Sequence, residues 1–194
     1  MMLVLVLLFY ALEWPASGLI YQRSLLIYED QWWRLLTAPL IHFSWQHLLL
    51  NLSLAWPLML LLERRKRSHL LFLYCTSTLL TTVYIFHCLP KLEYFAGLSG
   101  FIMALWIYTL CDVIATSDNF KLRLIVVLLF LLSVLKIILE AAHISIFSGN
   151  ETSFHVVWQA HAFGLVSGLC LAAWLTLKDF LFKTGHPVDC KNKV

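Results

Sequence analysis

Six apolar stretches follow one another along this chain, and most approach the length of about 20 residues that a helix needs to cross a bilayer core about 30 Å thick. Of the 194 residues, 61% are hydrophobic and 13% are charged, and the mean hydropathy is +0.81. Ordinary soluble domains carry about 25% charged residues, so a soluble domain is excluded. Seven glycines and five prolines are too few for a collagenous or linker-rich chain. We therefore expect an all-α polytopic membrane protein.

The predicted protein is a single membrane domain of six helices that fills residues 1–194. Its first span is short, because about 14 residues of helix cover only about 21 Å, which leaves room for a start further upstream. A cleaved signal peptide is the alternative, and the lack of a positive charge before the apolar residues disfavours it. The expected spans are 1–14, 47–62, 68–89, 98–115, 122–139 and 156–177, followed by a short cytoplasmic tail at 178–194.

Lysine and arginine are divided unevenly between the two sets of connections, and basic residues mark the cytoplasmic side. Ten of the fourteen follow the second, fourth and sixth spans. Both termini are therefore predicted to be cytoplasmic, and these three spans run from outside to inside. The long external connection at 15–46 is rich in tryptophan, so we expect it to lie in the membrane interface. The ten basic residues are Arg64, Arg65, Lys66, Arg67, Lys121, Arg123, Lys178, Lys183, Lys191 and Lys193.

Polar side chains stand in the first turns of the three spans that share this direction. His47 and Asn51 lie four residues apart, on one face of the second span. Ser99 opens the fourth span, and His161 lies near the start of the sixth. First turns of parallel helices lie at one depth, so the four side chains can converge beneath the outer surface. Polar groups within a bilayer are costly and are candidates for function.

Glycines flank these polar residues. Gly97 and Gly100 surround Ser99, and Gly164 and Gly168 form a G-x-x-x-G step after the histidine of the sixth span. Small residues at this spacing let two helix backbones approach closely. If the fourth and sixth spans pack through them, the serine and the histidine come within hydrogen-bonding reach.

A serine beside a histidine base is the minimal activated nucleophile of acyl-transfer chemistry. The donors at hand for an oxyanion are His47, Asn51 and the Ser99 amide. The three parallel spans carry no acidic residue at this depth, so the sequence predicts a dyad of Ser99 and His161, with the imidazole oriented by packing or water. No cofactor is expected. A metal site is not expected either, because the eight histidines form no H-E-x-x-H pair.

Each of these signals has a structural explanation when it is taken alone. The G-L-S-G segment is common in helix packing and lacks the last glycine of a G-x-S-x-G elbow. His161 can serve as a hydrogen bond between helices, and so can the pair of His47 and Asn51. Their occurrence together, at one depth and on one side, favours the catalytic interpretation.

Together these residues resemble the rhomboid family of intramembrane serine proteases, over residues 22–177 and in the family's order and spacing. The resemblance implies a six-helix rhomboid-like bundle, with Ser99 as nucleophile on the floor of a water-filled cavity that opens to the outside. It implies that His161 acts as base and then as acid, and that His47, Asn51 and the Ser99 amide form the oxyanion hole. The residues that carry it are Trp33-Arg34, His42-Phe43-Ser44, His47 to Asn51, Glu63, Gly97 to Gly100 and Ala160 to Gly168. The expected structural support comes from Trp33, Arg34, Glu63, Gly97, Gly100, Gly164 and Gly168.

The chain departs from the family pattern at two points. Met103 stands where rhomboids commonly carry a ring that packs on the catalytic histidine, and the Glu63 segment lacks its usual terminal glycine. The small size and the stretch at 28–37 (Y-E-D-Q-W-W-R-L-L-T) are similar to the rhombosortase branch. That similarity implies a bacterial inner-membrane protein that processes secreted proteins ending in a Gly-Gly motif, a membrane helix and a basic tail.

The expected partners are a membrane-anchored protein substrate and membrane lipid. Nucleic acid is not expected, because the only basic run is at 64–67. A non-proteolytic rhomboid relative that binds membrane proteins is the first alternative, although such proteins typically lack the serine or the histidine. A small transporter that uses intramembrane histidines is the second. The sequence leaves open whether water or another amine resolves the acyl-enzyme.

Overall fold

The computed structural model describes residues 18–142 and 157–184, and gives the backbone alone for residues 63–69 and 179–184. Five stretches within it are long and apolar enough to cross a membrane. The prediction of an all-α polytopic membrane bundle is thereby confirmed. The expected first span, at 1–14, lies outside the described residues. The five stretches are Trp45–Leu62, Leu70–Cys88, Ser99–Thr116, Phe120–Ala141 and Trp158–Lys178.

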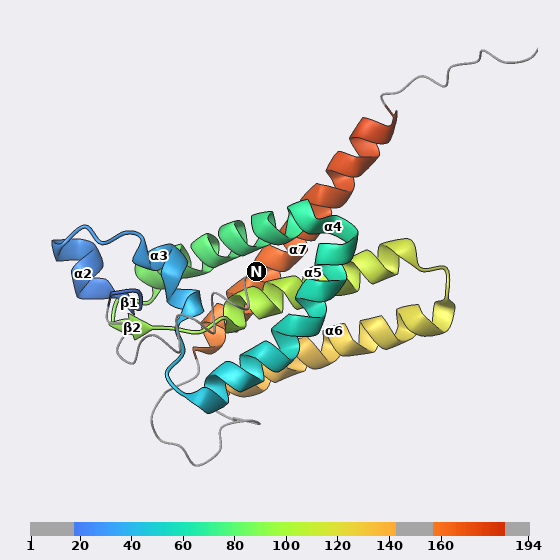
Figure 1. Ribbon diagram of the computed structural model, residues 1–194. Helices are drawn as coiled ribbons and strands as arrows, with labels where there is room; N and C mark the ends of the chain where they lie inside the picture. Colours follow the sequence, from blue (N-terminus) through green and yellow to red (C-terminus); the bar gives the residue numbers. More distant parts are fainter. Residues whose placement is uncertain (1–17, 143–156, 185–194) are drawn as a thin grey trace, which may run out of the picture.

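The second and third expected spans belong to one helical run of 44 residues, α4 (Trp45–Cys88). The sequence predicted a connection between them, but no glycine or proline stands at 63–69, and arginine and lysine are good helix formers. The backbone therefore stays helical through the basic run. Figure 1 shows that α4 bends sharply in its middle into two arms, so the first arm (Trp45–Leu62) and the second arm (Leu70–Cys88) remain separate spans.

Three more helices complete the bundle: α5 (Ser99–Thr116), α6 (Phe120–Ala141) and α7 (Trp158–Thr184). The first arm of α4, α5 and α7 begin at the same end of the bundle and share a direction, whereas the second arm and α6 run the opposite way (Figure 1). Most of α5 is buried between its neighbours, whereas α6 lies at the periphery with only Val126, Ser133 and Ile137 buried.

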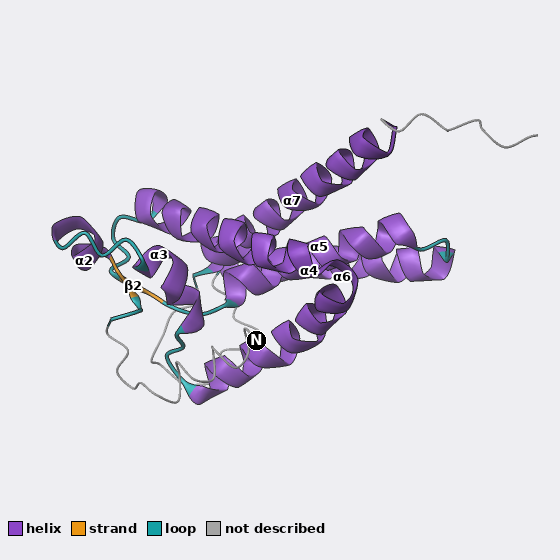
Figure 2. Ribbon diagram, turned by 45° about the horizontal axis from the view of Figure 1, so that its top comes forward, coloured by secondary structure: helices purple, strands orange, loops and turns teal. Residues whose placement is uncertain are grey.

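Short elements cover the end of the bundle where α5 and α7 begin, which we call the loop end. They are β1 (Tyr21–Gln22), α2 (Arg23–Tyr28), α3 (Arg34–Thr37), the 3-10 turn η1 (Ala38–Leu40) and β2 (Tyr94–Phe95). Figure 2 shows the strands beside α2 and α3. The strands pair antiparallel with Tyr21 opposite Phe95, which ties the first loop to the segment that leads into α5. The sequence did not predict this pairing, because strands of two residues leave no periodic signal.

Small residues set the distance between α5 and α7. A methyl group added at Gly168 would lie 2.5 Å from the Ala104 carbonyl oxygen and 2.8 Å from its Cα atom. A methyl group at Gly164 would overlap the Gly100 carbonyl. The two backbones are therefore in direct contact, which only glycine allows. This contact lies one residue after Ser99 on α5 and three residues after His161 on α7.

Candidate active site

The first turn of α4 presents His47 and Asn51 on one helix face. Ser44 caps the helix, because its side-chain oxygen accepts a hydrogen bond from the His47 amide at 3.2 Å. A cap of this kind fixes where a helix begins and therefore which way its first side chains point. Asn51 is buried, and His47 is half-buried.

Gly97 brings the segment before α5 against this pair. Its φ of +110° lies in a region that side chains disfavour. A methyl group at this position would lie 2.6 Å from His47 Cε1, 2.9 Å from His47 Nε2 and 3.7 Å from Asn51 Nδ2. The turn that leads into Ser99 therefore lies on the imidazole edge and faces the Asn51 amide.

His42 is a buried partner of Asn51 that was part of the sequence resemblance but received no role there. Its Nε2 lies 3.0 Å from Asn51 Nδ2, and its ring meets the His47 ring edge-on at 5.0 Å. Burial, with the nearby His47, lowers the pKa of His42 to about 3, so its ring is neutral. Neutral Nε2 accepts one of the two Asn51 amide hydrogens, which fixes the amide and leaves the second hydrogen available.

Ser99 is the first residue of α5 and is half-buried. The first amides of a helix have no partner within the helix, and they stand at its positive end. Ile102 already bonds to the Leu98 carbonyl, so the amides of Ser99, Gly100 and Phe101 are the ones left over. Amides in this position are suited to receive negative charge on an oxygen.

His161 approaches the serine from the first turn of α7. A methyl group at Gly100 would lie 3.3 Å from the Ala160 carbonyl oxygen, so the residues next to Ser99 and His161 are in contact. Gly97, two residues before Ser99, lies against His47 on the other side. The structure thus brings the four predicted polar residues to one place. Within the described residues, no hydrogen bond joins the Ser99 hydroxyl to His161.

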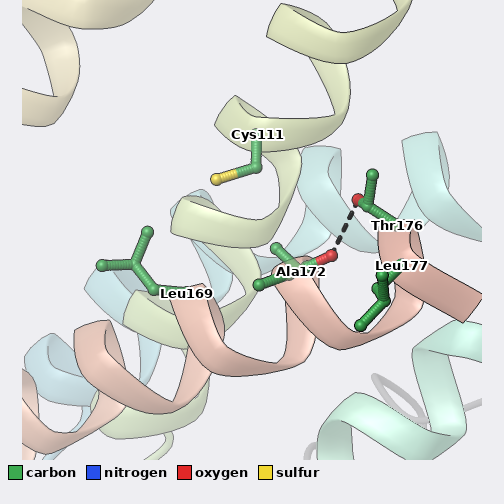
Figure 3. A pocket seen from close by; sticks show the side chains of 6 residues that line it. Cys111, Leu169, Ala172, Thr176 and Leu177 are labelled. Atoms are coloured by element: carbon green, nitrogen blue, oxygen red, sulfur yellow. Dashed lines mark hydrogen bonds between the residues drawn. The ribbon is translucent and has the colours of Figure 1, made fainter.

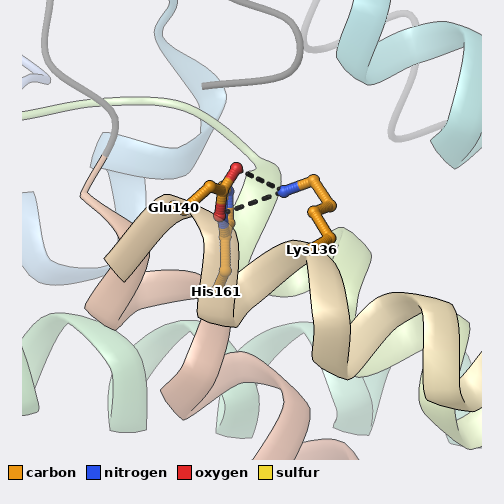
Figure 4. A network of polar contacts seen from close by, with 3 residues as sticks. All are labelled: Lys136, Glu140 and His161. Carbon is orange, nitrogen blue, oxygen red and sulfur yellow. Dashed lines mark hydrogen bonds and ion pairs between the residues drawn. The ribbon is translucent and has the colours of Figure 1, made fainter. Parts of the chain in front are cut away.

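An acidic group that the sequence analysis missed holds His161. Its Nδ1 lies 2.7 Å from Glu140 Oε2, and Lys136 Nζ lies 2.6 Å from Glu140 Oε1 and 3.3 Å from the same ring nitrogen (Figure 4). The expectation that packing or water orients the imidazole was wrong, because it considered only the three parallel spans. The last turn of the antiparallel α6 lies level with their first turns. The signal was a Lys-x-x-x-Glu pair at the end of a helix that is almost entirely apolar after Arg123.

Met103 lies one turn after Ser99 in an apolar cluster that joins α5, α6 and α7. It is buried together with Ile107 and Ile137, and Ala162 packs against the same cluster. Met103 thus belongs to the apolar cluster against which the start of α7 packs.

The first loop is held by Arg34, which is buried although it carries a charge. Its guanidinium donates to the Ile20 carbonyl at 2.7 Å and to Gln31 Oε1 at 2.8 Å, and Trp33 Nε1 donates to the Gly18 carbonyl at 3.2 Å. These bonds tie the start of the described chain onto α3. Glu63 lies in α4, and its side chain is outside the described ones.

A hollow opens between α5 and α7, lined by residues including Cys111, Leu169 and Thr176 (Figure 3). Its lining is almost entirely apolar, and Thr176 donates to the Ala172 carbonyl of its own helix. Cys111 lies twelve residues after Ser99, about 18 Å further along the helix. This hollow is therefore separate from the polar cluster. Among the described residues, no group of three or more His, Cys, Asp or Glu could hold a metal ion.

Comparison with known proteins gives one family match. The model of a family described as "Rhomboid domain" matches residues 29–178, which include the first loop after Tyr28, Ser99, His161 and all five described spans. No curated protein matches the chain. Rhomboid-family proteins are generally intramembrane serine proteases that act on membrane proteins. A match over most of the chain, on a helical membrane bundle that gathers His47, Asn51, Ser99 and His161, shows that this integral membrane protein belongs to the rhomboid family.

Proposed function

We propose that this protein is an intramembrane serine endopeptidase that cleaves membrane-anchored proteins near the outer face of the membrane. The observation that carries the proposal is the position of the segment from Gly97 to Gly100. Gly97 touches His47 on one side, and Gly100 lies against Ala160 on the other. Ser99 stands between these contacts, so an oxyanion pocket and a histidine base flank one serine.

The proposed reaction starts with attack of the Ser99 hydroxyl oxygen on a substrate carbonyl, while its proton passes to His161 Nε2. The oxyanion that forms accepts hydrogen bonds from the Ser99 amide, Asn51 and His47. His161 then returns the proton to the leaving amine, which breaks the peptide bond and leaves an ester on Ser99. Water, or another amine, releases the acyl group and restores the hydroxyl.

The loop end, where these groups lie, is proposed to face the outside of a bacterial inner membrane. The basic run at 64–67 and the basic residues at 121 and 123 lie at the opposite ends of the spans. An excess of basic residues marks the cytoplasmic side, which would also hold both termini. The span in α7 ends at Lys178, so the rest of the helix, up to Thr184, would belong to the cytoplasmic tail.

The proposed substrates are secreted proteins that end in a Gly-Gly motif, a membrane helix and a basic tail, as the similarity of residues 28–37 to rhombosortases implies. A helix hides its carbonyls in its own hydrogen bonds, so cleavage needs a segment that unwinds. Glycine favours unwinding because it loses the most conformational freedom in a helix. A Gly-Gly site also presents no side chain that the glycine-lined turn at Ser99 must accommodate.

Cleavage by purified protein in liposomes tests this proposal. The substrate is a membrane-anchored protein with a Gly-Gly site, and its partner substrate carries Leu-Leu there. Wild type is expected to cut at or next to the Gly-Gly site, and Ser99→Ala and His161→Ala to lose the activity. Ser53→Ala is the matched control, because Ser53 is exposed and bonds only to its own helix.

A fluorophosphonate probe gives a second readout that needs no substrate. It should label wild type on Ser99 and leave Ser99→Ala unlabelled. Cleavage at the wild-type rate by Ser99→Ala would refute the assignment. Equal cleavage of the Leu-Leu substrate would refute the Gly-Gly preference alone, and a wild type that neither labels nor cleaves would favour a non-proteolytic binding role.

A further inference from the structure

The contact between Glu140 and His161 lies at a point where ionised groups are costly. The side chains of Glu140 and His161 are each 11% exposed, and that of Lys136 is 30% exposed. Lys136 and Glu140 lie on α6, whose most apolar stretch of 18 residues has a mean hydropathy of 2.8. Glu140 also stands in the last turn of α6, where the negative end of the helix disfavours an anion. A carboxylate in this position needs specific partners.

The distances determine which hydrogen lies between the two groups. Nδ1 and Oε2 are 2.7 Å apart, so a hydrogen lies between them. Lys136 Nζ lies 2.6 Å from the other carboxylate oxygen, which favours the ionised form of Glu140. A carboxylate has no hydrogen to donate, so the hydrogen belongs to Nδ1 of the ring. Lys136 at 3.3 Å from Nδ1 is then a neighbour of the ring and not its donor.

This assignment fixes the tautomer of His161. With Nδ1 protonated, Nε2 carries the lone pair that a general base requires. We propose that Glu140 is the positioning residue of the active site, so that Ser99, His161 and Glu140 work as a triad in which Lys136 keeps the carboxylate ionised. This inference rests on the proposed peptidase function.

The role of Glu140 is clear from the movement of the proton during the proposed reaction. The Ser99 proton moves to Nε2, and the Nδ1 proton stays where it is, so His161 becomes a cation beside the Glu140 carboxylate. The ion pair stabilises that cation, and it disappears when Nε2 gives its proton to the leaving amine. Glu140 thus stays ionised throughout, and it neither gains nor loses a proton.

The kinetic test compares carboxylate variants in liposomes with the same Gly-Gly substrate. Glu140→Gln keeps the size and removes the charge, Glu140→Asp restores the charge, and Asp118→Asn is the matched control on an exposed loop residue. We expect Glu140→Gln to lower kcat about 10- to 100-fold with KM changed less than about twofold, because the ion pair forms only after substrate has bound. Glu140→Asp should recover at least part of kcat, and Asp118→Asn should match wild type.

The spectroscopic test does not depend on activity, and its central measurement is made on the wild-type protein. Solid-state NMR of protein with ¹⁵N-labelled histidine reports which ring nitrogen carries the hydrogen, and His161→Gln identifies the signal among the eight histidines. We expect His161 to be protonated on Nδ1 and bare on Nε2, in wild type and in Ser99→Ala.

These measurements separate failure of the inference from failure of the proposed function. Wild-type kcat in Glu140→Gln, a change in KM alone, or a His161 signal protonated on Nε2 would each overturn the role of Glu140 while Ser99→Ala remains inactive. Full activity of Ser99→Ala would instead overturn the peptidase assignment, and the NMR signature would still decide how His161 is held.

Discussion

Gly97 is constrained both by its backbone conformation and by its contact with His47 in the candidate site. Its positive φ favours a residue without a side chain, and an added methyl group would lie only 2.6 Å from the His47 ring. Gly97→Ala should therefore lower the free energy of unfolding by about 1–3 kcal/mol through backbone strain. It should also displace His47 and reduce kcat/KM about 100-fold, as expected when an oxyanion donor is lost.

Peptidase assays and thermal unfolding in dodecyl maltoside measure both effects. Gly18→Ala is the matched control, because a methyl group there meets nothing within 4 Å. The control should behave as wild type. If Gly97→Ala were as active and as stable as Gly18→Ala, the contact between this turn and His47 would not matter.

The residues of the candidate site differ in how well the sequence alone predicts them. His47 and Asn51 share a helix face, Ser99 is flanked by glycines, and all three lie in first turns of spans with one direction, so the sequence predicted that they lie close together. The sequence did not predict that Glu140 belongs to the site, because its position depends on the return of α6 to the loop end. The pairing of His42 with Asn51 was not foreseen, because a loop residue has no helical register to locate it.

At the scale of elements, the contact between α5 and α7 sets the distance between the helix that carries Ser99 and the helix that carries His161, the two proposed catalytic residues. Gly164 lies against Gly100, next to Ser99, whereas Gly168 lies against Ala104, one turn further along. Gly168→Ala should separate the helices and cost about 1–3 kcal/mol of stability, with much of the activity per folded molecule retained. Gly164→Ala should lose both stability and activity, because it moves the backbone beside the serine.

Val166→Leu is the control for this pair, since Val166 is 51% exposed on the opposite face of the same helix. Melting temperature and the rate of fluorophosphonate labelling report stability and active-site geometry separately. If both glycine variants had the melting temperature and the labelling rate of Val166→Leu, the close approach of α5 and α7 would not matter for stability or for the active site.

Hydropathy predicted the spans, and each difference between the expected and the observed spans has a physical cause. Apolar length located the five described spans to within a few residues, because the bilayer fixes how long a helix must be. The connection expected at 63–67 still separates two spans, but its backbone is helical, because no residue there breaks a helix. Figure 1 shows that α4 bends between its two arms, and no glycine or proline stands at 63–69 that could have predicted the bend.

At the scale of the whole molecule, the loop end combines burial with ionisable groups, and this makes stability depend on pH. His42 is 1% exposed and its pKa is lowered to about 3, whereas in the unfolded chain it returns to its ordinary value of 6.5. Between these values the unfolded state binds one more proton than the folded state. Stability therefore falls as pH decreases through this window.

The expected loss from His42 is about 2 kcal/mol between pH 7 and pH 5, at about 1.4 kcal/mol per pH unit below the unfolded pKa. Thermal unfolding in dodecyl maltoside from pH 7.5 to 4.5 measures it. His42→Gln keeps an acceptor for the Asn51 amide, so it should unfold with a clearly weaker dependence on pH, even if it is less stable at pH 7. His87→Gln replaces an exposed histidine and should keep the wild-type slope. An unchanged slope in His42→Gln would mean that other groups carry the acid sensitivity, and that the pairing of His42 with Asn51 is not held by a neutral ring.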